Sequence, residues 1–230
     1  MVTTAQTFHA DPRLAEAGFT AGVTVRGMGD MADAANRLRA LDIAGLGHQP
    51  SYFHKQVHGG TVEDVATATS EPREADGWVV SQPGRTAIVY AADCMPIFVW
   101  DKGGRAGAVL HSGWKGTKAN IAAEGARKLQ ELGVAPLTMQ AYVGAHIGPC
   151  CYAVGEDFQS IFRPSSLLRR GGKLYLDLGA EARAQLIDAG LPAAAITEDK
   201  ACTACSGEFY SFRREKSGTR MMAFLAKRHG

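Results

Sequence analysis

Two histidines and one cysteine combine metal-binding chemistry with small neighbouring residues. His58 is followed by two glycines, His111 is followed by Ser112-Gly113, and Cys94 directly follows an apolar run. Glycine at such positions lets a ligand approach the backbone closely. Two imidazoles and one thiolate are good ligands for Zn²⁺, and three protein ligands leave a fourth position open. The three residues are far apart in the sequence, which suits a catalytic site better than a structural one.

Three other interpretations use the same residues. The first is two hydrogen-bonded histidines and one buried cysteine without metal. The second is a Cu²⁺ site, which favours two histidines and one cysteine with a weak axial methionine. Met95 adjoins Cys94, but neighbours on an extended strand point to opposite faces, so Met95 is a poor axial ligand. The third is a Cys94 nucleophile activated by His111, with Asp93 as the carboxylate that orients the base.

The segment Thr86–Thr117 has to position these groups. It contains three short apolar runs separated by turn residues, which is typical of buried strands. Asp93 and Cys94 follow the first run, and His111 ends the third. Because α/β proteins usually place their chemistry at the ends of buried strands, we expect the site to lie there.

The rest of the pattern predicts a mixed α/β chain folded as one domain over residues 1–230, with residues 1–18 as a loose leader. Expected helices are Asp30–Leu41, Lys118–Leu132, Glu156–Phe162 and a helix capped by Asp177 that runs to Ala189. Other expected strands are Phe19–Gly27, Ser51–Gln56, Thr61–Val65, Gly77–Ser81, Leu137–Ile147, Lys173–Leu176 and Met221–Leu225.

Composition excludes several classes of protein. The chain has 230 residues, of which 46% are hydrophobic, and this supports a sizeable core. A net charge of +2 does not indicate a nucleic-acid partner. No apolar run approaches the length of a membrane span, and the N-terminus lacks the features of a signal peptide. We therefore expect a cytoplasmic monomer whose five cysteines are reduced.

Three further residues are candidates for binding substrate or phosphate. Lys115 lies in the turn after His111, where a lysine and the N–H groups of a helix start can hold an anion. His146 ends an apolar run and is expected to line the same pocket. One member of the pair Arg213-Arg214 can reach an anion, and we select Arg214. The alternatives are a surface lysine, a hydrogen-bonded core histidine and a solvated arginine pair.

The other four cysteines are expected to be structural. Cys150 and Cys151 cannot both point the same way from an extended backbone, so they are poor joint ligands. Cys202 and Cys205 have the spacing of metal and redox pairs, but the sequence offers no second pair with that spacing. We therefore expect one of Cys150 and Cys151 to be buried and the other to be a packing group, and we interpret Cys202 and Cys205 as structural.

Five motifs occur together in a characteristic order. They are Gln56-Val57-His58-Gly59, Ala92-Asp93-Cys94-Met95-Pro96, His111-Ser112-Gly113-Trp114-Lys115-Gly116-Thr117, His146-Ile147-Gly148-Pro149-Cys150-Cys151-Tyr152 and Phe209-Tyr210-Ser211-Phe212-Arg213-Arg214. With these motifs, residues 50–226 resemble the laccase-domain family, also described as the YfiH-type polyphenol oxidase family.

The resemblance implies a four-layer α-β-β-α sandwich and zinc ligands at His58, Cys94 and His111. It also implies a purine nucleoside phosphorylase that acts on adenosine, inosine and 5′-methylthioadenosine and deaminates adenosine. Purine nucleoside and phosphate are then the expected partners, and Cys94, His111 and Asp93 the expected catalytic residues. The alternatives are a copper-dependent phenol oxidase, a cysteine hydrolase that edits peptidoglycan precursors, and a non-catalytic binding module containing zinc.

Overall fold

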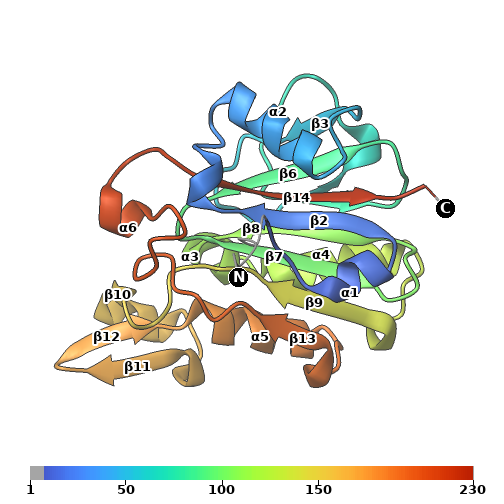
Figure 1. Cartoon of the computed structure of the whole chain (residues 1–230). Helices are drawn as coiled ribbons and strands as arrows, with labels where there is room; N and C mark the ends of the chain where they lie inside the picture. The colour runs from blue at the N-terminus through green and yellow to red at the C-terminus, as the bar shows by residue number, and fades with distance from the viewer. Residues whose placement is uncertain (1–7, 230) are drawn as a thin grey trace, which may run out of the picture.

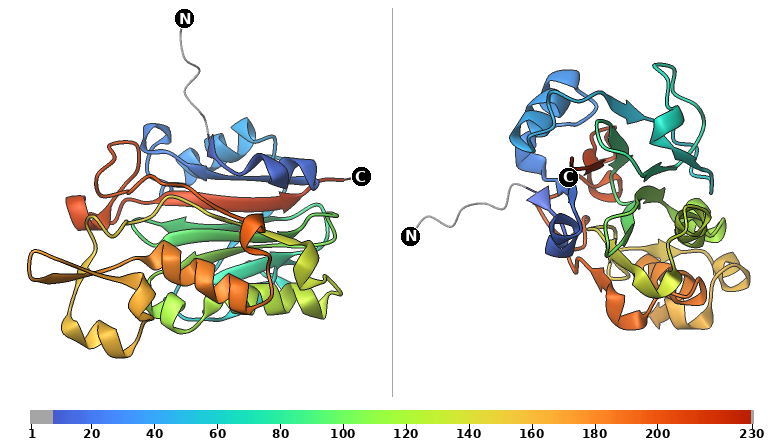
Figure 2. Two further views of the ribbon diagram at one scale, coloured as in Figure 1. Left: turned by 90° about the horizontal axis from the view of Figure 1, so that it is seen from below. Right: turned by 90° about the vertical axis from the view of Figure 1, so that its right-hand side faces the viewer.

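The computed structural model describes residues 8–229, which form two large β-sheets stacked between helices (Figure 1; Figure 2). The strands are β1 (Phe8–His9), β2 (Phe19–Thr24), β3 (Ser51–Phe53), β4 (Val62–Asp64), β5 (Gly77–Val80), β6 (Thr86–Ala91), β7 (Met95–Asp101), β8 (Gly107–Ser112), β9 (Met139–Val143), β10 (Ala153–Val154), β11 (Leu167–Arg170), β12 (Lys173–Leu176), β13 (Ile196–Glu198) and β14 (Met221–Lys227).

Six α-helices and six short 3₁₀ helices connect these strands. The α-helices are α1 (Pro12–Glu16), α2 (Ala34–Ile43), α3 (Trp114–Lys118), α4 (Ile121–Glu131), α5 (Leu178–Asp188) and α6 (Phe212–Glu215). The 3₁₀ helices are η1 (Arg26–Met28), η2 (Val65–Thr67), η3 (Pro136–Thr138), η4 (Glu156–Ser160), η5 (Pro164–Ser166) and η6 (Ala193–Ala195). As predicted, Asp177 caps α5, because its side chain accepts a hydrogen bond from the N–H of Ala180.

The two large sheets differ in strand order. One has five strands in the order β1-β2-β14-β6-β3, and the other has six in the order β13-β9-β7-β8-β5-β4. The short strands β10, β12 and β11 form a separate sheet at the edge of the molecule (Figure 1). Consecutive strands β6 and β7 belong to different large sheets, so the Asp93-Cys94 turn joins the two layers.

The hydrophobic core is divided by the alternation of side chains along each strand. On β7, Ile97 and Val99 face α4 and α5, whereas Phe98 and Trp100 pack between the two sheets. The outer face of the five-stranded sheet packs against α2 through a third cluster that includes Leu41 of that helix. The fold is therefore the predicted mixed α/β sandwich with four layers, α-β-β-α.

Two predictions about local structure are wrong. Residues 8–18 are not a loose leader, because β1 pairs with β2 and Asp11 caps α1; residues 1–7 lie outside the described residues. The helix predicted over Lys118–Leu132 is interrupted, because Asn120 adopts a left-handed conformation with φ of 60°. The chain already turns helical at Trp114, so Lys115 lies in α3 rather than in a turn.

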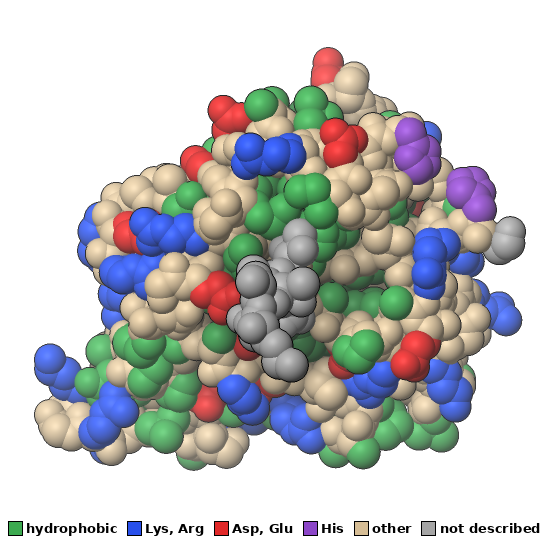
Figure 3. Space-filling model, in the orientation of Figure 1, with side chains coloured by type: hydrophobic (Ala, Val, Ile, Leu, Met, Phe, Trp, Pro, Cys, Tyr) green, Lys and Arg blue, Asp and Glu red, His purple; other side chains and the backbone are tan. Residues whose placement is uncertain are grey.

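Charged side chains do not form one continuous basic face on the side of the molecule shown in Figure 3, where Lys and Arg side chains are spread among acidic and neutral ones. None of the helices described is long and apolar enough to cross a bilayer.

Candidate metal centre and cavity

Three adjacent strands of the six-stranded sheet bring the candidate metal ligands together. In the β7–β8 pair, Met95 lies opposite Ser112, so Cys94 lies next to the end of β8 that carries His111. In the β5–β8 pair, Gly77 lies opposite Leu110, and the N–H of His111 donates to the carbonyl oxygen of Asp76 at 2.7 Å. His58 approaches the same sheet edge from the loop between β3 and β4.

His58, Cys94 and His111 converge, and we refer to these three residues as the triad. Their ligand atoms, the two imidazole nitrogens and the cysteine sulfur, all lie within 4.8 Å of one another. The imidazole rings of His58 and His111 meet edge to face with centroids 4.8 Å apart. His111 is buried, Cys94 is half-buried and His58 is exposed, so the group opens towards solvent on one side.

Asp76, which was not among the predicted site residues, positions His111 and the His58 loop through hydrogen bonds. Its carboxylate is fully buried and accepts a hydrogen bond from His111 Nδ1 at 2.9 Å. It also accepts the backbone N–H groups of His58 at 2.9 Å and Gly59 at 2.6 Å. One carboxylate therefore fixes the His111 tautomer, which leaves Nε2 free, and also holds the His58 loop. The available signal was an acid flanked by Ala75 and Gly77 at the start of a strand.

The three buried groups shift one another's pKa values. Burial raises the pKa of Cys94, but hydrogen bonds with His111 and His58 lower it from 9.0 to about 7. Burial lowers the pKa of His111, but hydrogen bonds with Asp76 and Cys94 raise it from 6.5 to about 9. Burial raises the pKa of Asp76, and the His111 and backbone hydrogen bonds bring it below its usual value. The cysteine is thus close to its thiolate form, which is the form that binds metals.

The backbone around the triad is shaped for a bound ion. His58 adopts a φ of 61°, which is uncommon for a non-glycine residue and is held here by the hydrogen bonds to Asp76. A Cβ atom on Gly113 would lie 2.7 Å from Cys94 Sγ and 3.4 Å from His58 Cδ2. Any side chain at this position would enter the space beside the Cys94 sulfur and the His58 ring. The donor set and this space fit a Zn²⁺ ion with one open position.

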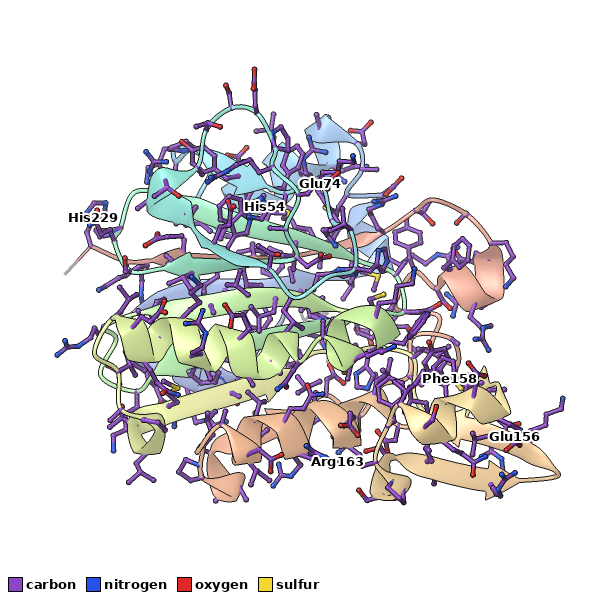
Figure 4. All side chains as sticks on the ribbon, turned by 180° about the vertical axis from the view of Figure 1, so that it is seen from behind. His54, Glu74, Glu156, Phe158, Arg163 and His229 are labelled. Atoms are coloured by element: carbon purple, nitrogen blue, oxygen red, sulfur yellow. The ribbon has the colours of Figure 1, made fainter. Side chains whose placement is uncertain are left out.

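A cavity of about 750 Å³ lies over the triad and is large enough for a small organic molecule. Its lining combines apolar and aromatic side chains with a few cations. The lining residues include Phe53, Tyr90, Trp114, Ile147, Tyr152, Leu178, Phe212, Lys55, Arg213 and Arg220. The ring of Trp114 packs against that of Phe158, with centroids 5.2 Å apart. Phe158 is the residue labelled on η4 in Figure 4.

Asp93 lines the triad cavity, but its carboxylate is hydrogen-bonded to other groups than His111. Its carboxylate accepts the Thr203 hydroxyl and the Arg213 N–H, each at 2.6 Å, and the carboxylate that orients His111 belongs to Asp76. Asp93 has a φ of 81°, which is uncommon for a non-glycine residue. The residue therefore joins the cavity wall to the C-terminal loops.

The residues predicted to bind substrate or phosphate lie elsewhere. Lys115 is exposed on α3, with Nζ 5.6 Å from the Trp114 ring centroid, and is not part of the described cavity lining. His146 is buried, and it lines a second cavity of about 400 Å³ instead. The Arg214 guanidinium donates to the carbonyl oxygens of Thr203, Ser206 and Phe209. Its neighbour Arg213 is the arginine that lines the triad cavity.

The remaining four cysteines lie together, which the sequence analysis did not predict. Cys150, Cys151, Cys202 and Cys205, which we call the cysteine cluster, place their sulfur atoms within 4.8 Å of one another. Residues 149–151 form a turn, so the assumption of an extended backbone at Cys150-Cys151 does not hold. All five cysteines are free in the structure.

Comparison with known proteins identifies the family. The model of a family described as multi-copper polyphenol oxidoreductase laccase matches residues 19–228. The chain belongs to this family. It is 35% identical over 176 residues to a purine nucleoside phosphorylase of Aquifex aeolicus, covering 76% of this chain and 82% of that protein. It is 30% identical over 200 residues to the purine nucleoside phosphorylase YfiH of Escherichia coli, covering 83% and 79%.

Solved structures of other proteins share the fold over nearly the whole chain. The crystal structure of YlmD from Geobacillus stearothermophilus superposes with a TM-score of 0.84 at 26% identity, covering 98% of this chain and all of that one. A Bacillus licheniformis protein, YfiH, gives a TM-score of 0.87 at 24% identity and 98% coverage of both chains. The resemblance inferred from the five motifs is therefore confirmed.

Proposed function

We propose that this protein is a zinc-dependent purine nucleoside phosphorylase that acts on adenosine, inosine and 5′-methylthioadenosine and also deaminates adenosine. The observation that carries the proposal is the open triad at the base of an aromatic cavity of about 750 Å³. The names of the relatives from Aquifex aeolicus and Escherichia coli support the purine nucleoside phosphorylase part of this proposal. We propose His58, Cys94 and His111 as the metal ligands.

In this proposal, different residues of the cavity contact the purine base, the phosphate and the metal ion. Aromatic rings such as Trp114 and Tyr152 suit the faces of a purine, and the Arg213 side chain supplies positive charge at the same wall. Asp76 holds His111 so that Nε2 can bind the ion. A bound zinc ion would supply Lewis acidity and a water of lowered pKa.

Phosphorolysis exchanges one bond of the nucleoside for another. A phosphate oxygen bonds to C1′ of the ribose while the C1′–N9 bond breaks, and the purine leaves with the electron pair and takes up a proton. Deamination of adenosine instead replaces the C6 amino group with oxygen from water and releases ammonia. The two reactions differ in their need for phosphate, which makes them separable in one assay.

The test of the proposal is product analysis of purified protein loaded with zinc. Inosine with phosphate should yield hypoxanthine and ribose 1-phosphate, and inosine without phosphate should remain intact. Adenosine in phosphate-free buffer should yield inosine and ammonia. Absence of all these products, with zinc present at the triad, would contradict the proposed function.

Arg213 is our proposed phosphate contact in place of Lys115, His146 and Arg214. Its Nη1 donates to the Cys151 carbonyl oxygen at 2.9 Å. Its backbone N–H donates to the Asp93 carboxylate, and this hydrogen bond does not depend on the side chain. Arg213→Ala should raise the phosphate concentration needed for half-maximal inosine cleavage about tenfold, the value of one charge-assisted hydrogen bond. Lys115→Ala is the matched control and should change it less than about twofold. The reverse result would restore Lys115 as the phosphate residue.

A copper-dependent phenol oxidase is the second candidate, because the matching family is described as a multi-copper laccase. Met95, the residue next to Cys94, is completely buried in the hydrophobic cluster between the six-stranded sheet and helices α4 and α5. Its sulfur atom therefore does not supply an axial ligand to a copper ion at the triad. Oxygen uptake with a phenol by protein loaded with copper, exceeding nucleoside cleavage by protein loaded with zinc, would favour this candidate.

A further inference from the structure

We propose that the cysteine cluster is a second metal site, in which Cys150, Cys151, Cys202 and Cys205 bind one Zn²⁺ ion as four thiolates. Two turns far apart in the sequence meet at this point, and each contributes two sulfur atoms. The site is separate from the triad and closed, because four protein ligands fill a tetrahedral zinc site.

The spacing of the sulfur atoms suits a single ion. All four lie within 4.8 Å of one another, with Cys150 and Cys205 3.6 Å apart and Cys151 and Cys205 3.2 Å apart. Zn–S bonds of about 2.3 Å in a tetrahedron place the sulfur atoms roughly 3.8 Å apart. A disulfide requires about 2.05 Å. The sulfur atoms are therefore grouped as ligands of one ion rather than as a bonded pair.

The backbone of both turns is arranged around the sulfur atoms. The N–H of Cys151 donates to Gly148 O at 3.0 Å, and the N–H of Cys205 donates to Cys202 O at 3.1 Å. The N–H of Gly148 points at Cys202 Sγ from 3.2 Å, a contact that favours a negatively charged sulfur. A Cβ atom on Gly148 would lie 3.4 Å from Cys150 Sγ, so a bare backbone covers this side of the cluster.

Three arginines surround the cluster and match the charge of such a site. Arg170 donates to Cys150 O and Arg213 to Cys151 O, each at 2.9 Å, and Arg214 donates to Thr203 O at 2.8 Å. Four thiolates around one divalent cation carry a net double negative charge. Guanidinium groups beside the ligating turns stabilise this charge and fix the carbonyl oxygens of the same turns.

The cluster also connects to the wall of the triad cavity, and this gives the ion a structural role. Thr203, between the two C-terminal cysteines, donates its hydroxyl to Asp93, the neighbour of Cys94. Tyr152 follows Cys151 directly and lines the cavity, as does Arg213. An ion that joins the two turns would therefore hold this wall in place.

The test is zinc analysis combined with zinc-edge X-ray absorption, which does not depend on enzyme activity. Wild-type protein purified without chelator should contain about two Zn²⁺ per chain, one at each site. His58→Ala, which removes a triad ligand, should keep one Zn²⁺ per chain with four sulfur neighbours at about 2.3 Å. Nitrogen ligands on the ion that remains, iron in its place, or no metal would overturn the proposal.

A second variant and a thiol count keep the result interpretable. Cys202→Ser should lose one Zn²⁺ and retain an ion with nitrogen and sulfur neighbours at the triad. Wild-type protein unfolded in chelator without reductant should expose all five thiols, and a count of three or one would mean disulfides in place of metal. If Cys202→Ser does not fold, the spectrum of His58→Ala still decides the proposal.

Discussion

The triad and the cysteine cluster use similar chemistry in opposite ways. The triad offers three candidate ligands, two from strand ends and one from the β3–β4 loop, opens into a cavity and is held by the buried carboxylate of Asp76. The cysteine cluster has four ligands from two turns, lies partly exposed and is surrounded by arginines that donate to backbone carbonyl oxygens.

The difference shows what a protein must supply for an ion that reacts and for one that only holds structure. An open coordination position can serve catalysis where the strand ends and the cavity hold the substrate next to the metal ion. A closed set of four ligands needs no cavity, and its contribution is to tie together loops that bury little apolar surface. Losses at the triad should therefore appear in activity, and losses at the cysteine cluster in stability.

The largest effect is expected at the exposed histidine of the triad. His58→Ala should reduce inosine cleavage at least about 100-fold. Loss of a residue that only hydrogen-bonds to a metal ligand already lowers metal affinity or activity roughly 10–100-fold, and loss of the ligand itself should lower it at least as much. Its melting temperature should change by no more than about 2–4 °C, the equivalent of roughly 1 kcal/mol in a chain of this size. His48→Ala, which removes an exposed histidine outside the cavity lining, is the control. Unfolding of His58→Ala would make the triad structural and erase the contrast.

Asp76→Asn is expected to have the next largest effect. An amide has only one acceptor oxygen, so it cannot accept both the His111 and His58 N–H groups, which share Oδ1, and the Gly59 N–H, which donates to Oδ2. Zinc affinity at the triad should fall roughly 10–100-fold, and inosine cleavage at limiting zinc should fall with it. Competition with a zinc-binding dye measures the affinity. Unchanged affinity in a folded variant would mean that the triad forms without its supporting carboxylate.

Arg214→Met tests the cysteine cluster side of the comparison. The substitution keeps an apolar stem but removes hydrogen bonds to the carbonyl oxygens of Thr203, Ser206 and Phe209. The free energy of unfolding should fall by about 2 kcal/mol, or roughly 4–8 °C in melting temperature. Arg169→Met, at an exposed ion pair with Glu156, should change it far less. A higher phosphate requirement with unaltered stability would return Arg214 to the substrate site.

The smallest effect is expected at His9, which ties β1 to the loop that leads to Cys202. His9 hydrogen bonds with Asp199 at 2.7 Å and Glu208 at 2.8 Å. The hydrogen bond with Asp199 outweighs burial and, with Glu208, raises the pKa of His9 from 6.5 to about 9. Because the folded state holds the proton more tightly, the stabilisation is complete below pH 6.5 and disappears as the pH rises through 9.

His9→Gln should therefore lower the free energy of unfolding by about 1 kcal/mol at pH 6, after allowance for solvent screening of a half-buried group. At pH 10 the variant and the wild type should differ much less. Thermal unfolding of both proteins at the two pH values measures this. An equal deficit at both would mean that packing, and not charge, holds β1 to the loop.

The sequence predicted the central strands and the triad because the relevant signals are local. β6, β7 and β8 appear as apolar runs with turn residues between them, and each triad residue combines a metal-binding group with small neighbours. Asp76 has no comparable signal, because an acid before a strand is common in turns. Its importance comes from the β5–β8 register, which places it beside His111.

The cysteine cluster was missed because two local assumptions failed together. Cys150-Cys151 lies in a turn that brings both sulfur atoms close to that of Cys205. Cys202 reaches this turn because His146 and Cys202 form a β-bridge, a long-range pairing that has no local signal in the sequence. Lys115 was misplaced for a related reason. Helix α3 begins at Trp114, immediately after Gly113, and this carries the lysine out to the surface.

The most direct test of the central claim is hypoxanthine release from inosine by Cys94→Ala, measured on protein whose zinc content is known. We expect a folded protein that keeps about one Zn²⁺ per chain at the cysteine cluster and produces no hypoxanthine above the rate without enzyme. Cleavage at the wild-type rate by that protein would contradict the assignment of the triad as the reactive centre.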